Sequence, residues 1–212
     1  MITLKHFTFG PFQENTYVLW DETLDCVIID PGNSNANENK TLSDFISANH
    51  LKPQRLLLTH AHIDHINGNQ YVYDTYKLLP EVHPNDVVFI EKHTATATMY
   101  GLSVEQSPMP KAFINEGDVI TLGNTSLQTL FTPGHSPGSI TFYNEDQKLL
   151  ISGDVLFYGS IGRTDLPLGD HTTLINSIKQ KLMVLADDVK VYSGHGPATT
   201  IGFERMNNPF LN

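Results

Sequence analysis

The chain has 212 residues, of which 40% are hydrophobic and 17% are charged, so it is long and apolar enough to bury a sizeable core. These figures exclude a disordered chain, a collagen-like chain and a coiled coil. Thirteen Lys and Arg against 23 Asp and Glu give a formal charge of −10, which argues against nucleic acid or an anionic membrane surface as the partner.

The first half of the chain predicts strands that are followed by helices. Alternating or continuous apolar residues indicate strands, and apolar residues that recur on one helical face indicate helices. The expected strands are residues 2–9, 16–20, 26–29 and 56–58, and the expected helical segments are residues 41–49, 67–76 and 85–100. Residues 101–112, which are rich in Pro and Met, favour a loop.

The second half repeats this order, with strands first and a helix after them. The expected strands are residues 119–122, 126–131, 139–143, 149–152 and 189–192, and the expected helix is residues 172–185. The chain shows neither a low-complexity linker nor a short repeat, so we expect one domain over residues 1–212. Both halves of the chain show strands together with helices. This repeated pattern favours an α/β fold in which two sheets pack face to face with helices outside.

Cysteine usage and the N-terminus bear on the compartment. Cys26 is the single cysteine and cannot form an internal disulfide, so no disulfide within the chain requires an oxidising environment. The first residues lack the apolar run of a secretory signal, and no stretch approaches about 18 consecutive apolar residues. We therefore expect a cytoplasmic protein with no membrane partner, and a monomer by default.

Four side chains that can bind metal lie within six residues, directly after the strand at 56–58. They are His60, His62, Asp64 and His65. The chain turns at the end of a buried strand, so His60 and His62 can converge on one metal, while Asp64 and His65 can face a neighbouring one. Neutral imidazole and carboxylate suit zinc, iron or manganese, and no thiolate narrows the choice.

Three further candidates each follow a predicted strand in a loop that contains glycine: His135, Asp154 and His195. Taken singly, each histidine would be interpreted as a surface or core residue, and Asp154 as a turn residue or helix cap. The dense cluster at 60–65 predicts a metal site, and the repeated context of these three residues places them at the same rim.

At this point the sequence resembles the metallo-β-lactamase superfamily over nearly the whole chain. The motifs that carry the resemblance are Asp30, His60-x-His62-x-Asp64-His65, His135, Asp154 and His195, which stand here in the family's order. The resemblance implies an αββα sandwich with metals in a cleft at the loop rim. Its implied ligands are His60, His62 and His135 for the first metal, Asp64, His65 and His195 for the second, and Asp154 for both. Asp30 would support the ligand loop; the alternative is a plain turn residue at the end of a strand.

Within the superfamily, two segments resemble the glyoxalase II-like group: residues 153–165 and residues 194–202. The chain ends before the C-terminal helical domain with which the long enzymes of that group grip glutathione. Arg163 stands where they place a Lys that contacts glutathione, and Asp165 stands where they place a Tyr. The resemblance therefore implies a thioester as the substrate class, but it does not identify the thiol.

The resemblance implies an enzyme that hydrolyses a small-molecule thioester of the hydroxyacylglutathione type. It implies two divalent metal ions as cofactors, with zinc expected first and iron or manganese as alternatives. A hydroxide that bridges the metals beside Asp64 and Asp154 would attack the carbonyl carbon. Arg163 is the candidate anchor for an anionic substrate, and a surface arginine in a salt bridge is the alternative.

A second enzyme class stays open, because persulfide dioxygenases also share the stretch at 162–165. In that case a single iron would be held by His60, His135 and Asp154, which is a site suited to O₂ chemistry. The sequence at 194–197 departs from the residues that group tends to show after its last strand. A third alternative is a module that binds metal without catalysis.

Overall fold

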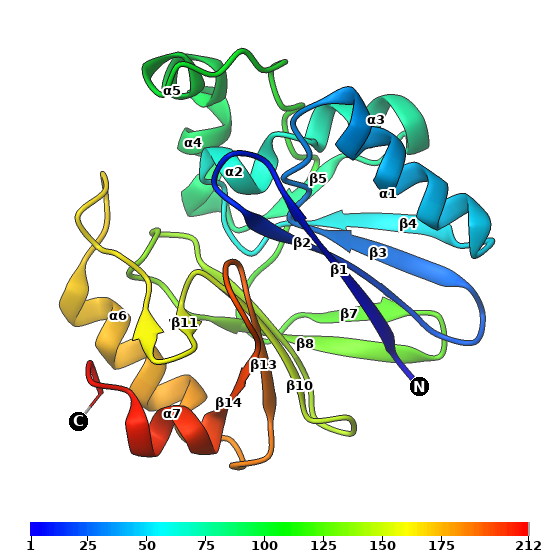
Figure 1. Cartoon of the computed structure of the whole chain (residues 1–212). Helices are drawn as coiled ribbons and strands as arrows, with labels where there is room; N and C mark the ends of the chain where they lie inside the picture. Colours follow the sequence, from blue (N-terminus) through cyan, green and yellow to red (C-terminus); the bar gives the residue numbers. More distant parts are fainter. Residues whose placement is uncertain (212) are drawn as a thin grey trace.

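A computed structural model describes residues 1–211, which form two six-stranded sheets that lie face to face (Figure 1). Helices of the first half cover the outer face of one sheet, and helices of the second half cover the outer face of the other. This layering is the αββα sandwich that the sequence predicts, and it is α/β in class. No helix among the described residues is long and apolar enough to cross a membrane.

The first sheet combines an antiparallel part with a parallel part. Its strands, in the order in which they lie, are β1 (Thr3–Phe9), β2 (Glu14–Trp20), β3 (Asp25–Ile29), β4 (Lys52–Leu57), β5 (Pro80–Val82) and β6 (Ala112–Phe113). Strands β1 to β3 pair antiparallel, and β3 to β6 pair parallel. The sequence does not predict β5 and β6, because strands of two or three residues are too short to show alternation.

The helices over this sheet differ from the prediction mainly at their ends. They are α1 (Ala36–Ala48), α2 (Ile63–Ile66), α3 (Asn69–Tyr76), α4 (Val87–Glu91) and α5 (His93–Met99), with a 3₁₀ turn at Pro84–Asp86. Helix α1 begins before the predicted residue 41, because the Asn35 side chain caps it by accepting from the backbone N–H of Glu38 at 3.1 Å. The predicted helix at 85–100 is interrupted at Lys92, where the backbone leaves helical geometry.

The second sheet is mostly antiparallel, and its strand order is β14-β13-β10-β9-β8-β7. The strands are β7 (Val119–Leu122), β8 (Thr125–Phe131), β9 (Ile140–Asn144), β10 (Leu149–Gly153), β13 (Lys190–Ser193) and β14 (Thr199–Thr200), and a small hairpin is formed by β11 (Leu156–Phe157) and β12 (Ser160–Ile161). The outer helices are α6 (His171–Ser177) and α7 (Ile201–Asn207). A π-helical turn, Ile178–Leu182, follows α6, so the predicted helix at 172–185 ends early and irregularly.

Apolar side chains of both sheets meet between them in one buried cluster. Leu19 and Leu57 of the first sheet and Phe142 and Ile151 of the second are all inaccessible to solvent there. Each such side chain contributes about 1.5–3 kcal/mol when it leaves water. This core fixes the two sheets against each other, and it thereby fixes the loops that follow their strands along one edge.

Candidate metal centre

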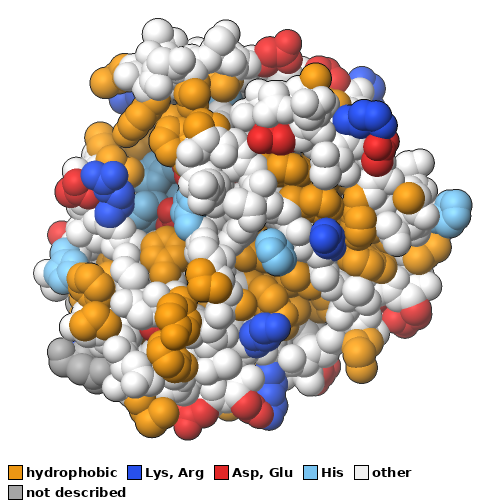
Figure 2. All heavy atoms as spheres, viewed as in Figure 1, with side chains coloured by type: hydrophobic (Ala, Val, Ile, Leu, Met, Phe, Trp, Pro, Cys, Tyr) orange, Lys and Arg blue, Asp and Glu red, His pale blue; other side chains and the backbone are white. Residues whose placement is uncertain are grey.

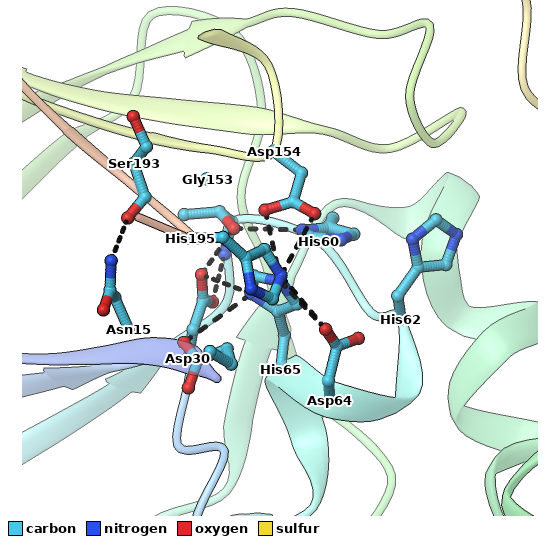
Figure 3. Close-up of polar contacts among 12 residues, drawn as sticks. Asn15, Asp30, His60, His62, Asp64, His65, Gly153, Asp154, Ser193 and His195 are labelled. Carbon is cyan, nitrogen blue, oxygen red and sulfur yellow. Dashed lines mark hydrogen bonds and ion pairs between the residues drawn. The ribbon is translucent and has the colours of Figure 1, made fainter. Parts of the chain in front are cut away.

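Seven side chains from the two halves converge at this edge, and all of them but His135 are labelled in Figure 3. Four of them come from the loop after β4 and from α2: His60, His62, Asp64 and His65. Three come from the second sheet, where His135 follows β8, Asp154 follows β10 and His195 follows β13. The structure thus brings together every residue that the sequence predicts as a metal ligand.

The first group is a triad of imidazoles. Nε2 of His135 lies 3.2 Å from Nε2 of His60 and 2.8 Å from Nδ1 of His62. Burial lowers the pKa of all three rings, and it lowers the pKa of His62 to about 3. The rings are therefore neutral near pH 7, and their facing nitrogen atoms can offer lone pairs to one cation.

The second group contains Asp64, His65 and His195. Oδ2 of Asp64 lies 3.2 Å from Nε2 of His195 and 3.9 Å from Nε2 of His65. Burial opposes the charge of Asp64, but the neighbouring His65 holds the pKa of Asp64 below its ordinary value. An ionised carboxylate and two imidazoles thus face one point.

Asp154 lies between the two groups. Its Oδ2 atom is 3.6 Å from Nε2 of His135 and 3.5 Å from Nε2 of His195, and its Oδ1 atom is 3.4 Å from Nε2 of His65. Burial opposes its charge, but His65 holds the pKa of Asp154 well below the ordinary range. One carboxylate therefore reaches both groups.

Two buried atoms at the centre indicate whether these residues can hold a metal ion. Nε2 of His65 and Oδ1 of Asp154 have no hydrogen-bond partner among the described residues. Buried polar atoms are almost always partnered. Because Nδ1 of His65 donates to Asp30, its Nε2 presents a lone pair to the lone pairs of Asp154 Oδ1, and two acceptors that face each other suit a cation between them. A Cβ atom at Gly194 would strike both side chains, so glycine at this position keeps the space between them open. The donor set of imidazole and carboxylate suits zinc, iron or manganese.

Four of the histidines are oriented by a hydrogen bond at the ring nitrogen that faces away from the centre. The acceptors are Oγ1 of Thr59 for His60 (3.1 Å), Oδ2 of Asp30 for His65 (3.1 Å), the carbonyl of Arg163 for His135 (2.8 Å) and the carbonyl of Gln13 for His195 (3.2 Å). Such bonds fix the tautomer and the direction of the ring.

Asp30 lies at the supporting position that the resemblance implies. Besides His65, it accepts from the backbone N–H of Thr59 at 2.7 Å and from the hydroxyl of Thr59 at 2.5 Å. Asp30 has a φ of +50°, a conformation that Asp tolerates better than most residues. The aspartate therefore joins the end of β3 to the ligand loop after β4.

Asp86 is a supporting residue that the sequence reasoning missed. Its buried carboxylate accepts from the N–H of Ala61 at 3.0 Å, from the hydroxyl of Ser136 at 2.8 Å and from the N–H of Gly138 at 2.6 Å. Burial raises the pKa of Asp86 to about 6. Nothing in the sequence around it signals this role, because its partners are mainly backbone atoms of distant loops.

The start of β2 supplies two more residues that the sequence reasoning missed. Glu14 is fully buried, with Oε1 at 3.9 Å from Nδ1 of His65, and burial raises the pKa of Glu14. Nδ2 of Asn15 donates to the carbonyls of Ser193 at 3.1 Å and Gly196 at 2.9 Å. Asn15 therefore holds the loop that carries His195 (Figure 3).

Arg163 forms a surface salt bridge, which is one of the two roles that the sequence analysis gives for this residue. Its Nε and Nη2 atoms donate to the carboxylate of Asp165 at 2.7 and 2.6 Å, and both side chains are more than 60% exposed. Contact between this guanidinium and a substrate stays a prediction. The backbone carbonyl of Arg163, which orients His135, has a role that the sequence does not indicate.

A cavity of about 820 Å³ opens in front of the centre and reaches His62, Asp64, His135, Asp154 and His195. Figure 2 shows it as a hollow with histidine at its base and hydrophobic side chains around it. The large side chains of its walls are mainly apolar or aromatic. The geometry is therefore that of a metal centre at the base of an open, largely apolar pocket.

Comparison with protein families gives a match to one family model. The model of the metallo-beta-lactamase superfamily matches residues 9–195, which include all seven converging side chains. Two curated relatives align over nearly their full length. The probable metallo-hydrolase YqgX of Bacillus subtilis (strain 168) is 41% identical, over 98% of this chain and 97% of its own. The hydroxyacylglutathione hydrolase GloC of Haemophilus influenzae is 38% identical, over 95% of this chain and 94% of its own.

Two solved structures are similar over the same extent. The crystal structure of the BLEG-1 B3 metallo-beta-lactamase has a TM-score of 0.91 and 38% identity, and the match covers 99% of this chain and 100% of that one. The crystal structure of TTHA1623 in a di-iron-bound form has a TM-score of 0.89 and 37% identity, with 98% and 100% covered.

Proposed function

Because the chain belongs to the metallo-beta-lactamase superfamily, we propose that it is a metal-dependent hydrolase that cleaves thioesters of the glyoxalase II type with two metal ions. The observation that carries the proposal is the position of Asp154. Its carboxylate faces the triad of His60, His62 and His135 on one side and His65 and His195 on the other. Two cation positions that share one carboxylate are the arrangement that a binuclear hydrolase requires.

In this proposal the triad holds one ion, and Asp64, His65 and His195 hold the other. The bound ions supply an activated water at neutral pH and polarise the carbonyl group of the substrate. The carboxylates of Asp64 and Asp154 line the cavity, so each can accept a hydrogen bond from an attacking water and orient it toward the carbonyl carbon. The thiolate leaves without a proton donor, so the site needs no general acid.

The thioester is supported by a relative and by the shape of the pocket. The Haemophilus relative is named a hydroxyacylglutathione hydrolase, whose substrate is a thioester by that name. The pocket is open and apolar enough to take an acyl chain beside the metal centre.

The dioxygenase alternative uses fewer of the converging residues. A single iron held by His60, His135 and Asp154 leaves the pair of Asp64 and His195, at 3.2 Å, without a role. The second group of ligands therefore favours the hydrolase.

The test combines metal content with substrate panels, on protein purified without chelators. We expect close to two metal ions per chain by elemental mass spectrometry, and cleavage of S-lactoylglutathione or another thioester. Asp154→Ala should lose turnover and metal together, whereas Asp44→Ala, which removes an exposed carboxylate paired with Lys40, should keep both. One iron per chain with oxygen consumption on a persulfide would overturn the proposal. Cleavage of a chromogenic cephalosporin and of no thioester would overturn it in favour of a lactamase.

A further inference from the structure

The cavity has two walls, and different side chains of each wall can contact a substrate. One wall comes from α4 and α5 and includes Phe89 and Lys92, and Phe89 packs against the ring of His62 with centroids 4.9 Å apart. The opposite wall comes from the hairpin β11–β12 and the loop after it, and it includes Phe157 and Leu168. Apolar surface thus lines both walls, and each wall also carries one cation, Lys92 on the first and Arg163 on the second.

The rim of the cavity is apolar and open to solvent. Phe12, Tyr100, Tyr158 and Leu168 all line the cavity, and each is between 37% and 61% exposed. The rings of Phe12 and Tyr100 meet edge to face with centroids 5.7 Å apart, so they join the turn after β1 to the end of α5. Exposed apolar rings that gather around a cavity indicate a ligand with apolar surface.

Two cations line the cavity among the described residues, and they differ in their partners. The guanidinium of Arg163 is neutralised by Asp165, which it contacts through two nitrogen atoms. The ammonium of Lys92 has neither an ion pair nor a hydrogen bond within the described part of the chain. The chain has a net charge of −10, so an unpaired ammonium in this cavity is unusual, and it can form an ion pair with an anionic group of a ligand.

We propose that the substrate is a thioester with an apolar acyl group and a thiol that carries a negative charge, and that Lys92 binds this charge. The inference rests on the proposed thioester hydrolase and names its substrate class. The thiol is assigned to the side of Lys92 because cleavage makes this half of the substrate more negative, and a cation favours its departure. The acyl group lies against Phe157 and Leu168. Lys92 therefore acts as a specificity residue, and the Arg163 guanidinium does not.

The test compares two thioesters that share the hexanoyl group and a two-carbon thiol, of which one thiol carries a negative charge and the other is neutral. Hexanoyl-2-mercaptoethanesulfonate is anionic, and hexanoyl-N-acetylcysteamine is neutral. Lys92→Gln should raise KM about fivefold for the anionic thioester and leave it unchanged for the neutral one, as expected for an exposed ion pair. The difference should shrink at high salt, which screens exposed charges. Lys52→Gln, which removes an exposed lysine at the start of β4, is the matched control.

Binding of an inert analogue separates this inference from the proposed reaction. Calorimetry with S-hexyl-2-mercaptoethanesulfonate, a thioether, on metal-loaded protein should show about fivefold weaker binding in Lys92→Gln than in the wild type. If neither thioester is cleaved but this difference appears, the reaction is wrong and the role of Lys92 stands. If both thioesters are cleaved and Lys92→Gln changes neither KM nor binding, the role of Lys92 is wrong. A larger loss in Arg163→Gln than in Lys92→Gln would also overturn it.

Discussion

Asp86 joins the two loops that carry the imidazole triad, although its own side chain reaches none of the three rings. It accepts from Ala61, which stands between His60 and His62, and from Ser136 and Gly138, which follow His135. Three donors converge on one buried carboxylate, so the two loops cannot move apart without leaving buried polar groups unpaired. The spacing of the triad therefore depends on a residue outside it.

Asp86→Asn is expected to weaken metal binding more than its small change in volume suggests. The amide group would face N–H donors that the carboxylate now accepts, which costs about 1–3 kcal/mol of stability. Affinity for the ion held by the triad should fall by roughly 10–100-fold, as for other residues that orient ligands. Metal titration and thermal unfolding would measure both effects, with Asp44→Asn as the surface control. Unchanged affinity in a folded variant would contradict the role.

The seven converging residues could be predicted from sequence, and their supporting residues could not. His60, His62, Asp64 and His65 are dense enough to stand out, and a repeated glycine context marked the other three. Asp86 and Asn15 bond largely to backbone atoms of distant loops, and such partners leave no residue type to recognise. Asp30 could be predicted only through the family resemblance, because a strand-ending aspartate is also a common turn residue.

The start of β2 links the first sheet to a ligand loop of the second. The backbone N–H of Asn15 donates to the carbonyl of Gly194 at 2.7 Å, and its side chain donates to the carbonyls on both sides, of Ser193 and Gly196. Gln13, at the preceding turn, accepts from the ring of His195. The loop after β13 is therefore held from across the interface between the sheets.

Asn15→Ala should loosen this loop and reduce metal at the group that contains His195. Two carbonyls would lose a donor, which is expected to cost about 2 kcal/mol of stability. Metal content should fall by up to one ion per chain while the imidazole triad keeps its own, because none of the triad's contacts includes Asn15. Asn207→Ala, which removes an exposed side-chain hydrogen bond within α7, is the control. Full retention of both ions in a destabilised Asn15→Ala protein would contradict the link.

The predicted strands are all observed, although β4 begins at Lys52, well before the predicted residue 56, because its first residues are polar. The five-strand core of the second half was predicted with ends within about two residues of those observed, which is the expected precision of such boundaries. Helix α1 began earlier because a polar segment that looks like a loop contains its cap at Asn35. The π-helical turn at Ile178–Leu182 was missed because it keeps an apolar face that an α-helix would also show.

The metal centre is a further connection between the two halves of the molecule. The first sheet and its helices supply His60, His62, Asp64 and His65, and the second sheet supplies His135, Asp154 and His195. Other connections include the apolar core between the sheets, the contacts made by Asn15, and Asp86, which accepts from Ser136 and Gly138 of the second half. An ion that binds ligands from both halves is bound by the folded state alone, so its binding free energy adds to stability.

Removal of metal should therefore lower the melting temperature substantially. An ion present at about 1,000 times its dissociation constant adds about 4 kcal/mol, and each kcal/mol is worth roughly 2–4 °C in a chain of this size. We expect a loss of about 10 °C for one ion and more for two, restored by adding zinc, iron or manganese. The Asp154→Ala variant, which should hold no metal, separates this effect from any action of the chelator, because its melting temperature should not respond. If the wild type loses its metal by elemental analysis and keeps its melting temperature, the converging residues do not join the halves through an ion.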